Sequence, residues 1–378
     1  MKSPVQKIAL NGGRYDMTWL LDSRAGQSLL AACRRSGERP RCLCVADGVD
    51  MYVGRRGKRY YLARMPGTGF LHADDCQCVE EASIFSGAGE YSSGVLTETT
   101  EGLLRINANL CRHTRAEPPI PEAGIDGLFD LLIEQAALNQ ISPGTERRTW
   151  ASVRDRLLEA SAWILLDGEK LSSLLFLPEP FVQEASRSAL KDCENFLTAN
   201  AANAARPALL CAPFKAFRAS DWSWQLILKH LPGLRLWVAK DAASQMEARW
   251  EQDWFSGAPE FALCLALVKP GRHKRNYTVS NLALAPTDIN FFPCANTQEA
   301  QIAQQLLDAG HALLRPLRFD ADPCAARADF AIVSGPSPEP VFVLSAREAG
   351  EEDSAKRTLA LLMQRNRARA HVFHVPVP

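Results

Sequence analysis

Four cysteines and one histidine near the N-terminus have the residue types and the spacing of a metal site. Cys42 and Cys44 form a Cys-x-Cys pair, His72 stands four residues before Cys76, and Cys78 follows shortly after. Thiolate sulfur and imidazole nitrogen are the donors of a tetrahedral zinc site. We therefore predict a structural zinc ion held by Cys42, Cys44, His72 and Cys76, with Cys78 as an alternative ligand. Ordinary reduced cysteines beside a surface histidine are the competing interpretation.

The segment between the two ligand pairs is expected to bring them together. Residues 51–64 alternate in polarity around a turn of glycine and basic residues, which predicts a β-hairpin. Upstream, a two-stranded element is expected over residues 7–21 and a helix from Ser23 to about residue 35. A hairpin with metal ligands at its base is the build of a zinc ribbon.

Length and composition set the broad class of the protein. The 378 residues exceed the size of one ordinary core, so two or three domains are expected. The 43 basic and 43 acidic residues cancel, so only local patches remain for binding a polyanion. The first thirty residues contain no apolar core of a signal peptide, which predicts a cytoplasmic protein without a membrane span. The cysteines are then expected to be thiols or metal ligands.

The pattern along the chain predicts an α+β multidomain protein. The expected parts are a zinc-ribbon-like domain at 1–82, a linker at 83–123, a winged-helix-like module at 124–182, a mixed α/β region at 183–285 and a restriction-endonuclease-like domain at 286–378. The linker is rich in Gly, Ser, Thr, Glu and Pro, and one strand is expected in it near residues 102–108.

The predicted winged-helix module consists of two helices and a β-ribbon. Helical spacing begins at Gly124 and again near residues 148–160, and strands are expected at 163–166 and 171–177. A helical hairpin that only packs against its neighbours is an equal alternative. Further along, Lys229 and His230 stand out, and a histidine satisfied within a tryptophan cluster is favoured over a functional site.

The last ninety residues predict the order α-β-β-β-α-β. Helices are expected at 297–309 and 352–365, and strands at 311–315, 329–334, 341–345 and 371–375. With Glu299 in the first helix and Asp329 at the start of a strand, this is the arrangement of PD-(D/E)XK nucleases. In that chemistry carboxylates hold Mg²⁺ ions that activate water.

The strand that should carry the remaining catalytic groups lacks them. Residues 340–346 contain neither a carboxylate nor a lysine, and Glu348 and Lys356 lie just beyond as migrated candidates. The catalytic candidates are therefore Glu299, Asp329, Glu348 and Lys356, vestigial if the site is degenerate. We expect a degenerate domain rather than an enzyme, with an active Mg²⁺-dependent nuclease using Glu299 and Asp329 as the alternative.

Several of these residues also carry a family resemblance. They are residues 42–44, 51–53 and 64–69, His72, Cys76, Arg148 to Trp150, residues 171–179, Lys229, His230, residues 316–320, Asp329 and Phe330. The chain resembles, over nearly its whole length, uncharacterised proteins encoded on bacterial plasmids and integrative conjugative elements. Its Cys/His pattern and C-terminus are also similar to competence proteins of the CoiA type. The resemblance implies a bacterial cytoplasmic protein of a mobile element that acts on or near DNA.

Two departures from that family argue against metal-dependent cleavage in this chain. Ala328 stands where the family has proline, and residues 342–345 lack the family's glutamate. The expectation is a DNA-binding accessory protein with other mobile-element proteins as possible partners; a protein-interaction scaffold without nucleic-acid binding is a further alternative. The expected phosphate contacts are Arg55, Arg56, Lys58, Arg59, Arg147, Arg148, Arg272, Lys274 and Arg275.

Overall fold

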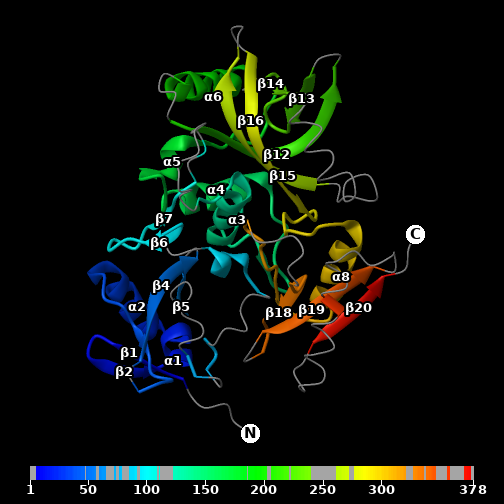
Figure 1. The fold of residues 1–378 in the computed structure, drawn as a ribbon. Helices are drawn as coiled ribbons and strands as arrows, with labels where there is room; N and C mark the ends of the chain where they lie inside the picture. The colour runs from blue at the N-terminus through cyan, green and yellow to red at the C-terminus, as the bar shows by residue number, and fades with distance from the viewer. Residues whose placement is uncertain are drawn as a thin grey trace.

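The structure is a computed structural model of the 378-residue chain. It describes residues 6–46, 48–56, 59–64, 72–73, 76–78, 85–91, 94–108, 110, 122–184, 186–201, 206–220, 223–239, 261–271, 276–320, 327–335, 338–345, 356–357 and 370–375. Within these residues the fold is a mixed α+β arrangement of several sheets. Figure 1 shows the N-terminal module and the C-terminal sheet in the lower part of the view, a large sheet in the upper part, and helices α3 and α4 between them.

The N-terminal module is a five-stranded sheet with two helices. Its elements are β1 (Lys7–Leu10), β2 (Gly13–Asp16), α1 (Met17–Asp22), α2 (Arg24–Ser36), β3 (Arg41–Cys42), β4 (Val49–Arg56) and β5 (Arg59–Arg64), with strand order β2-β1-β3-β4-β5. The Ser23 hydroxyl accepts a hydrogen bond from the Gly26 N–H at 2.9 Å, and Gly37 ends α2 at φ 72°. The predicted helix and hairpin are confirmed, whereas the end of the segment predicted as strand forms α1.

The next part of the chain combines a small sheet with the central helices. Its elements are η3 (Gly87–Glu90), β6 (Leu96–Glu98), β7 (Leu104–Ile106), α3 (Ile125–Gln135), β8 (Gln140–Ile141), α4 (Trp150–Ser161), β9 (Ile164–Leu166), β10 (Glu169–Lys170), α5 (Leu171–Leu174) and β11 (Leu175–Phe176). Strands β10, β9, β7 and β6 form one sheet in that order. Ile106 and Ala123, from the predicted linker, are buried in the same core as α3 and α4. Such packing does not define a domain boundary, so the four boundaries between the five predicted parts stay predictions.

The β-ribbon of the predicted winged-helix module differs in its second half. Asp167 and Gly168 turn the chain between β9 and β10 with φ values of 50° and 95°, as a tight hairpin turn requires. The predicted strand at 171–177 is instead one helical turn, α5, followed by the short β11. Leu171 and Leu174 are both buried, and residues three apart reach the same core only from a helix. Strand β11 pairs with β12 (Ala208–Ala219) rather than with β9.

Five strands in the upper part of Figure 1 close on themselves as a barrel. They follow helix α6 (Ser186–Ala201) and are β12 (Ala208–Ala219), β13 (Ser223–Leu228), β14 (Arg235–Ala239), β15 (Phe261–Pro270) and β16 (Asn276–Thr287). The sheet closes because its strand order β12-β13-β14-β16-β15 returns to the start: β15, the last strand, pairs with β12, the first. Along β12, Leu210 packs inside the barrel and Leu209 packs on the core of α3, so the strand is buried on both faces. The described part of the predicted mixed α/β region thus contains one helix followed by these five strands.

The C-terminal sheet has the predicted element order. It contains α8 (Thr297–Asp308), β17 (Leu313–Leu314), β18 (Phe330–Ile332), β19 (Glu339–Ser345) and β20 (His371–Val375), and its strand order is β20-β19-β18-β17-β8. Strands β19 and β20 are parallel, and the other neighbours are antiparallel. Of the predicted second helix, residues 356–357 are helical and the rest lies outside the described residues. No pattern in the sequence indicated β8, which extends this sheet from the preceding part of the chain.

Asp320 ties the segment between β17 and β18 to the start of α3. Its carboxylate accepts hydrogen bonds from the Gly124 N–H at 3.0 Å, from the Gly127 N–H at 3.3 Å and from the Tyr91 hydroxyl. A carboxylate at a helix N-terminus satisfies unpaired N–H groups and faces the positive end of the helix dipole. The segment 316–320 that contributes to the family resemblance therefore has a structural role.

Substitution of Gly87 tests a second contact with this segment. A Cβ atom at Gly87 would lie 1.8 Å from the main-chain oxygen of Arg318, so backbone must move. We expect Gly87→Ala to lower the free energy of unfolding by about 1–3 kcal/mol, as overpacking does. Gly89→Ala is the matched control in the same 3₁₀ helix, because its nearest atom is the Arg64 guanidinium at 4.0 Å. Urea denaturation of both variants measures the difference, and equal stability would contradict it.

Candidate metal centre and buried carboxylates

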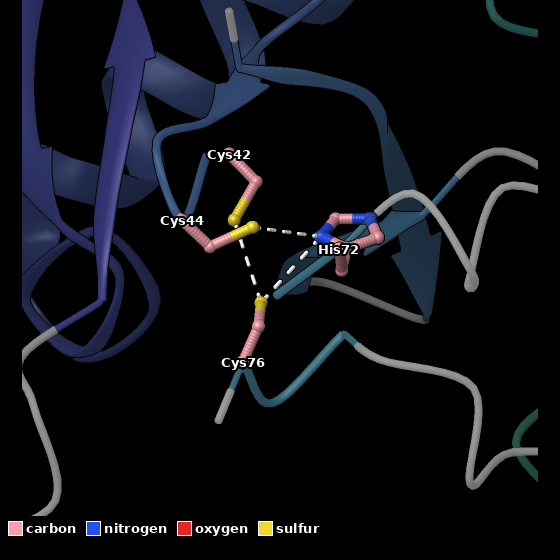
Figure 2. Close-up of side chains that lie close together, drawn as sticks. All are labelled: Cys42, Cys44, His72 and Cys76. Carbon is pink, nitrogen blue, oxygen red and sulfur yellow. Dashed lines mark hydrogen bonds between the residues drawn. The ribbon is translucent and has the colours of Figure 1, made fainter. Parts of the chain in front are cut away.

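The four predicted metal ligands come together at one end of the N-terminal sheet, where β3 and β5 end. Cys42 is the last residue of β3, Cys44 lies in the turn that follows, and His72 and Cys76 come after β5. Figure 2 shows the three sulfur atoms and one ring nitrogen of His72 directed toward one another. Because β3 and β5 flank β4 in one sheet, the fold brings the two ligand pairs to the same place.

The distances between the donor atoms fit a tetrahedral ion. Cys42 Sγ and Cys76 Sγ are 3.6 Å apart, and His72 Nδ1 lies 3.4 Å from Cys44 Sγ and 3.5 Å from Cys76 Sγ. All four donor atoms lie within 4.8 Å of one another. Tetrahedral bonds of about 2.3 Å to sulfur and about 2.0 Å to nitrogen place neighbouring donors roughly 3.5–3.8 Å apart. This cluster could therefore hold a metal ion, and its donors and spacing are consistent with zinc.

The orientation of His72 also suits coordination. Its side chain is buried, Nδ1 faces the sulfur atoms, and Nε2 is buried with no hydrogen-bond partner among the described residues. Coordination through Nδ1 uses the lone pair on that nitrogen and leaves the ring proton on Nε2. The surface histidine of the competing interpretation is not observed.

Gln6 and Cys78 lie against the cluster from outside. Gln6 Nε2 is 3.0 Å from Cys42 Sγ, 3.0 Å from Cys76 Sγ and 3.4 Å from Cys78 Sγ. The main-chain N–H of Cys78 also donates to Cys76 Sγ at 3.3 Å. Sequence reasoning missed Gln6 because it stands 36 residues before Cys42, outside any cysteine or histidine motif.

The thiols of the cluster differ strongly in acidity. A hydrogen bond from the Cys78 thiol, aided by the Gln6 amide, lowers the pKa of Cys42 to about 4 against the effect of burial. Burial raises the pKa of Cys76 to about 12, and the hydrogen bond with Cys42, together with burial, raises the pKa of Cys78. Burial therefore opposes ionisation of the Cys76 thiol, and a bound cation would offset that effect.

Cys78 is expected to be dispensable for metal binding. It is not among the four donors that converge, and a serine hydroxyl can still donate a hydrogen bond, so Cys78→Ser should keep one metal ion per chain. Cys76→Ser, the matched substitution two residues earlier, should lose the metal because it removes a donor. Elemental analysis and chelator competition on both variants measure this. Loss of metal in Cys78→Ser with retention in Cys76→Ser would reverse the assignment.

The two predicted carboxylates of the C-terminal domain, Glu299 and Asp329, also lie in one network, but each forms an ion pair with a cationic side chain of the same chain. Glu299 lies in the first turn of α8, and its Oε2 is 2.6 Å from a guanidinium nitrogen of Arg315. The same oxygen accepts the Ala295 N–H at 2.8 Å. Arg315 also donates to the main-chain oxygen of Asp329 at 2.9 Å and therefore bridges the two acidic residues.

Both carboxylate oxygens of Asp329 likewise have partners within the protein. Its Oδ1 is 2.7 Å from Lys356 Nζ, and its Oδ2 accepts the Val343 N–H at 2.7 Å. Both charged side chains are buried. Burial raises the pKa of Asp329, and the Lys356 ammonium opposes that rise. Glu348, the fourth catalytic candidate, lies outside the described residues.

A family model described as "Protein of unknown function (DUF1173)" matches residues 16–375. The chain belongs to this family. The matched span of this DUF1173 protein contains both the Cys/His cluster and the two buried carboxylates, whereas Gln6 precedes it. No curated protein and no solved structure matches the chain. Among the described helices of the DUF1173 chain, none has the length and apolar character needed to cross a membrane.

The predicted phosphate contacts of the DUF1173 chain fall into different environments. Arg59 is largely exposed and lies 3.5 Å from Asp22, and Arg147 is exposed. Arg55 pairs with Glu159 at 3.2 Å. The side chain of Arg56 and the whole of Lys58, Arg272, Lys274 and Arg275 lie outside the described residues.

Arg148 is a correction to the predicted set. Its side chain is buried and donates to the main-chain oxygens of Leu138, at 2.8 Å, and Gln140. The guanidinium therefore fastens the chain after α3, next to β8, and does not face solvent. The prediction of Arg148 as a phosphate contact is therefore wrong.

His230 has the structural role that the sequence favoured. Its Nδ1 accepts the Phe181 N–H at 2.9 Å, and its ring stacks on Trp150 with centroids 5.7 Å apart. Burial, and to a smaller extent Lys229, lower its pKa. The ring is therefore a satisfied part of the central core.

Proposed function

We propose that this DUF1173 protein is a zinc-stapled, DNA-binding accessory protein with a nuclease-like C-terminal domain that does not cleave DNA. The observation that carries the proposal is that both predicted catalytic carboxylates form ion pairs with cationic side chains of the same chain, Arg315 and Lys356. Glu299 pairs with Arg315 at 2.6 Å and Asp329 with Lys356 at 2.7 Å, which leaves their charge neutralised without Mg²⁺. A carboxylate held this way is a poor metal ligand until its partner moves.

The nuclease-like assignment is supported by topology. The chain runs through α8, β17, β18, β19, the helical residues 356–357 and β20. Strand β18 is antiparallel to both of its neighbours, and β20 pairs parallel with β19 at the edge of the sheet. Asp329 stands directly before β18. This is the α-β-β-β-α-β order expected from the sequence, with the acidic residue at the start of the second strand. Resemblance to proteins of plasmids and conjugative elements supplies the proposed setting, a bacterial mobile element.

The proposed zinc ion has a structural role. Cys42, Cys44, His72 and Cys76 would supply all four donors of a tetrahedron, so no position would remain for a reactive water. One bound ion would fix the turn after β3 against the segment after β5 and so stabilise the small N-terminal core.

DNA binding is proposed through exposed arginines of a chain whose net charge is zero. Filter binding to duplex DNA across a salt series tests this, because the affinity of a phosphate-binding protein falls linearly on a log–log scale. Arg59→Gln and Arg147→Gln should each reduce the slope by about one, whereas exposed Arg218→Gln serves as the control. Binding that is absent or independent of salt would contradict the proposal and favour a protein-interaction scaffold.

An active nuclease is the second candidate, and one contact favours it. Lys356 Nζ lies 2.7 Å from Asp329, so an acid and a lysine, two groups that metal-dependent phosphodiester hydrolysis uses, already meet at the predicted site. Supercoiled DNA incubated with Mg²⁺ or Mn²⁺ is the test. Cleavage that EDTA stops and that Asp329→Asn and Lys356→Met both abolish would replace the accessory function with this one.

A further inference from the structure

Gln6 is placed to control the proposed zinc centre from outside the ligand set. Its side-chain nitrogen lies 3.0 Å from both Cys42 Sγ and Cys76 Sγ. We infer that Gln6 is a positioning residue of the metal site, whose amide N–H groups orient these two thiolates and stabilise their negative charge. The inference rests on the proposed zinc site and adds a determinant of its affinity.

The fold fixes the backbone of Gln6 beside the ligands. Its main-chain oxygen accepts the Met17 N–H at 2.9 Å, and the residue directly precedes β1, which pairs with β3 so that Ile8 faces Cys42. The next residue, Lys7, accepts the Leu43 N–H at 2.9 Å, which holds the loop between Cys42 and Cys44 to the same strand. The amide therefore reaches the sulfur atoms from a rigid sheet.

The orientation of the amide has a cost that the thiolates offset. Gln6 Oε1 is buried and has no hydrogen-bond partner among the described residues. An unsatisfied buried acceptor destabilises the fold, so turning the N–H side toward sulfur needs a compensating interaction. Hydrogen bonds to anionic acceptors are about twice as strong as neutral ones, and metal-bound thiolates are such acceptors.

Substitution of Gln6 can test the hydrogen bonds that the protein donates to the ligand sulfur atoms. The other N–H donor to Cys76 Sγ is the main chain of Cys78, which substitution cannot delete. Residues that orient metal ligands typically contribute about 10- to 100-fold to affinity. Methionine has nearly the length and flexibility of glutamine without its N–H groups, and glutamate has its shape with acceptors alone.

Zinc affinity by chelator competition and the absorption spectrum of the Co²⁺-substituted protein test the inference. Gln6→Met should bind zinc about 10- to 100-fold more weakly and shift the sulfur-to-cobalt charge-transfer bands. Gln6→Glu should be weaker still, because its carboxylate faces the thiolates. Circular dichroism confirms that each variant is folded, and if Gln6→Met does not fold, Gln6→Glu decides the question alone.

Two other outcomes separate this inference from the proposed site. Affinity within twofold of the parent protein and an unchanged cobalt spectrum, whatever the effect on thermal stability, would show a merely structural glutamine and overturn the inference. A parent protein that binds no zinc or cobalt would instead overturn the metal site itself and the inference with it.

Discussion

Replacement of Cys42 by serine is expected to abolish stoichiometric zinc binding and to unfold the N-terminal module. Cys42 is completely buried and ends β3, so its sulfur enters the cluster from the centre of the sheet. A serine hydroxyl is a poor zinc ligand. Apparent binding energies of structural zinc are on the order of 10–16 kcal/mol and are coupled to folding. The core of this module is small, and such cores depend on a metal or another crosslink.

Cys33→Ser is the matched control for that experiment. Cys33 is equally buried in the same module, and its Sγ lies 2.9 Å from the main-chain oxygen of Glu38, which a serine hydroxyl can use as an acceptor. Elemental analysis should find one zinc per chain in Cys33→Ser and none in Cys42→Ser. Limited proteolysis should then cut Cys42→Ser within the N-terminal module. Full zinc content in Cys42→Ser would refute the assignment of Cys42 as a ligand.

The metal centre was largely predictable because its signals are local. Cys-x-Cys and His-x3-Cys are short motifs, and the hairpin between them follows from alternation across a turn. Gln6 was not predictable, since its role depends on the pairing of β1 with β3 across many residues. A glutamine carries no metal-binding signal of its own. Long-range register therefore sets the limit of sequence reasoning at this site.

The middle of the chain shows the same limit on a larger scale. Apolar runs near Leu209 and Leu265 predicted buried elements, but strands with two buried faces have no alternation that identifies their partners. Closure of the barrel depends on β12 pairing with both β13 and β15. The two-residue strand β8 is too short for any periodicity to indicate it.

In the C-terminal domain the sequence indicated which acidic residues come together, but not that they form ion pairs with Arg315 and Lys356. Glu299, Asp329 and Lys356 were all singled out, and the structure places them in one network. Arg315 was overlooked, although it bridges Glu299 and Asp329. Its position after a short strand gives no hint of burial. Whether a carboxylate binds a metal or an internal cation is decided by tertiary packing, which the motif does not encode.

Removal of the Asp329 carboxylate is expected to be strongly destabilising. Asp329→Ala would remove the carboxylate that lies 2.7 Å from the buried Lys356 ammonium and that accepts the Val343 N–H. Deleting one member of a buried ion pair typically costs about 3–5 kcal/mol. Urea denaturation followed by a probe in the C-terminal sheet should show a loss of that size. A loss below about 1 kcal/mol would contradict a buried pair and would leave Asp329 free for Mg²⁺.

A double-mutant cycle separates the charge from the packing at this pair. Asp329→Asn keeps an acceptor for Val343 and removes the charge, and Lys356→Met keeps most of the buried aliphatic volume. Each single variant should be destabilised because one charge or polar group loses its partner. The double variant should recover much of the loss, with a coupling of roughly 1–3 kcal/mol, because no unpaired charge remains. Additive effects would mean that Lys356 does not neutralise Asp329 in solution, and the case for a closed, non-cleaving site would then fail.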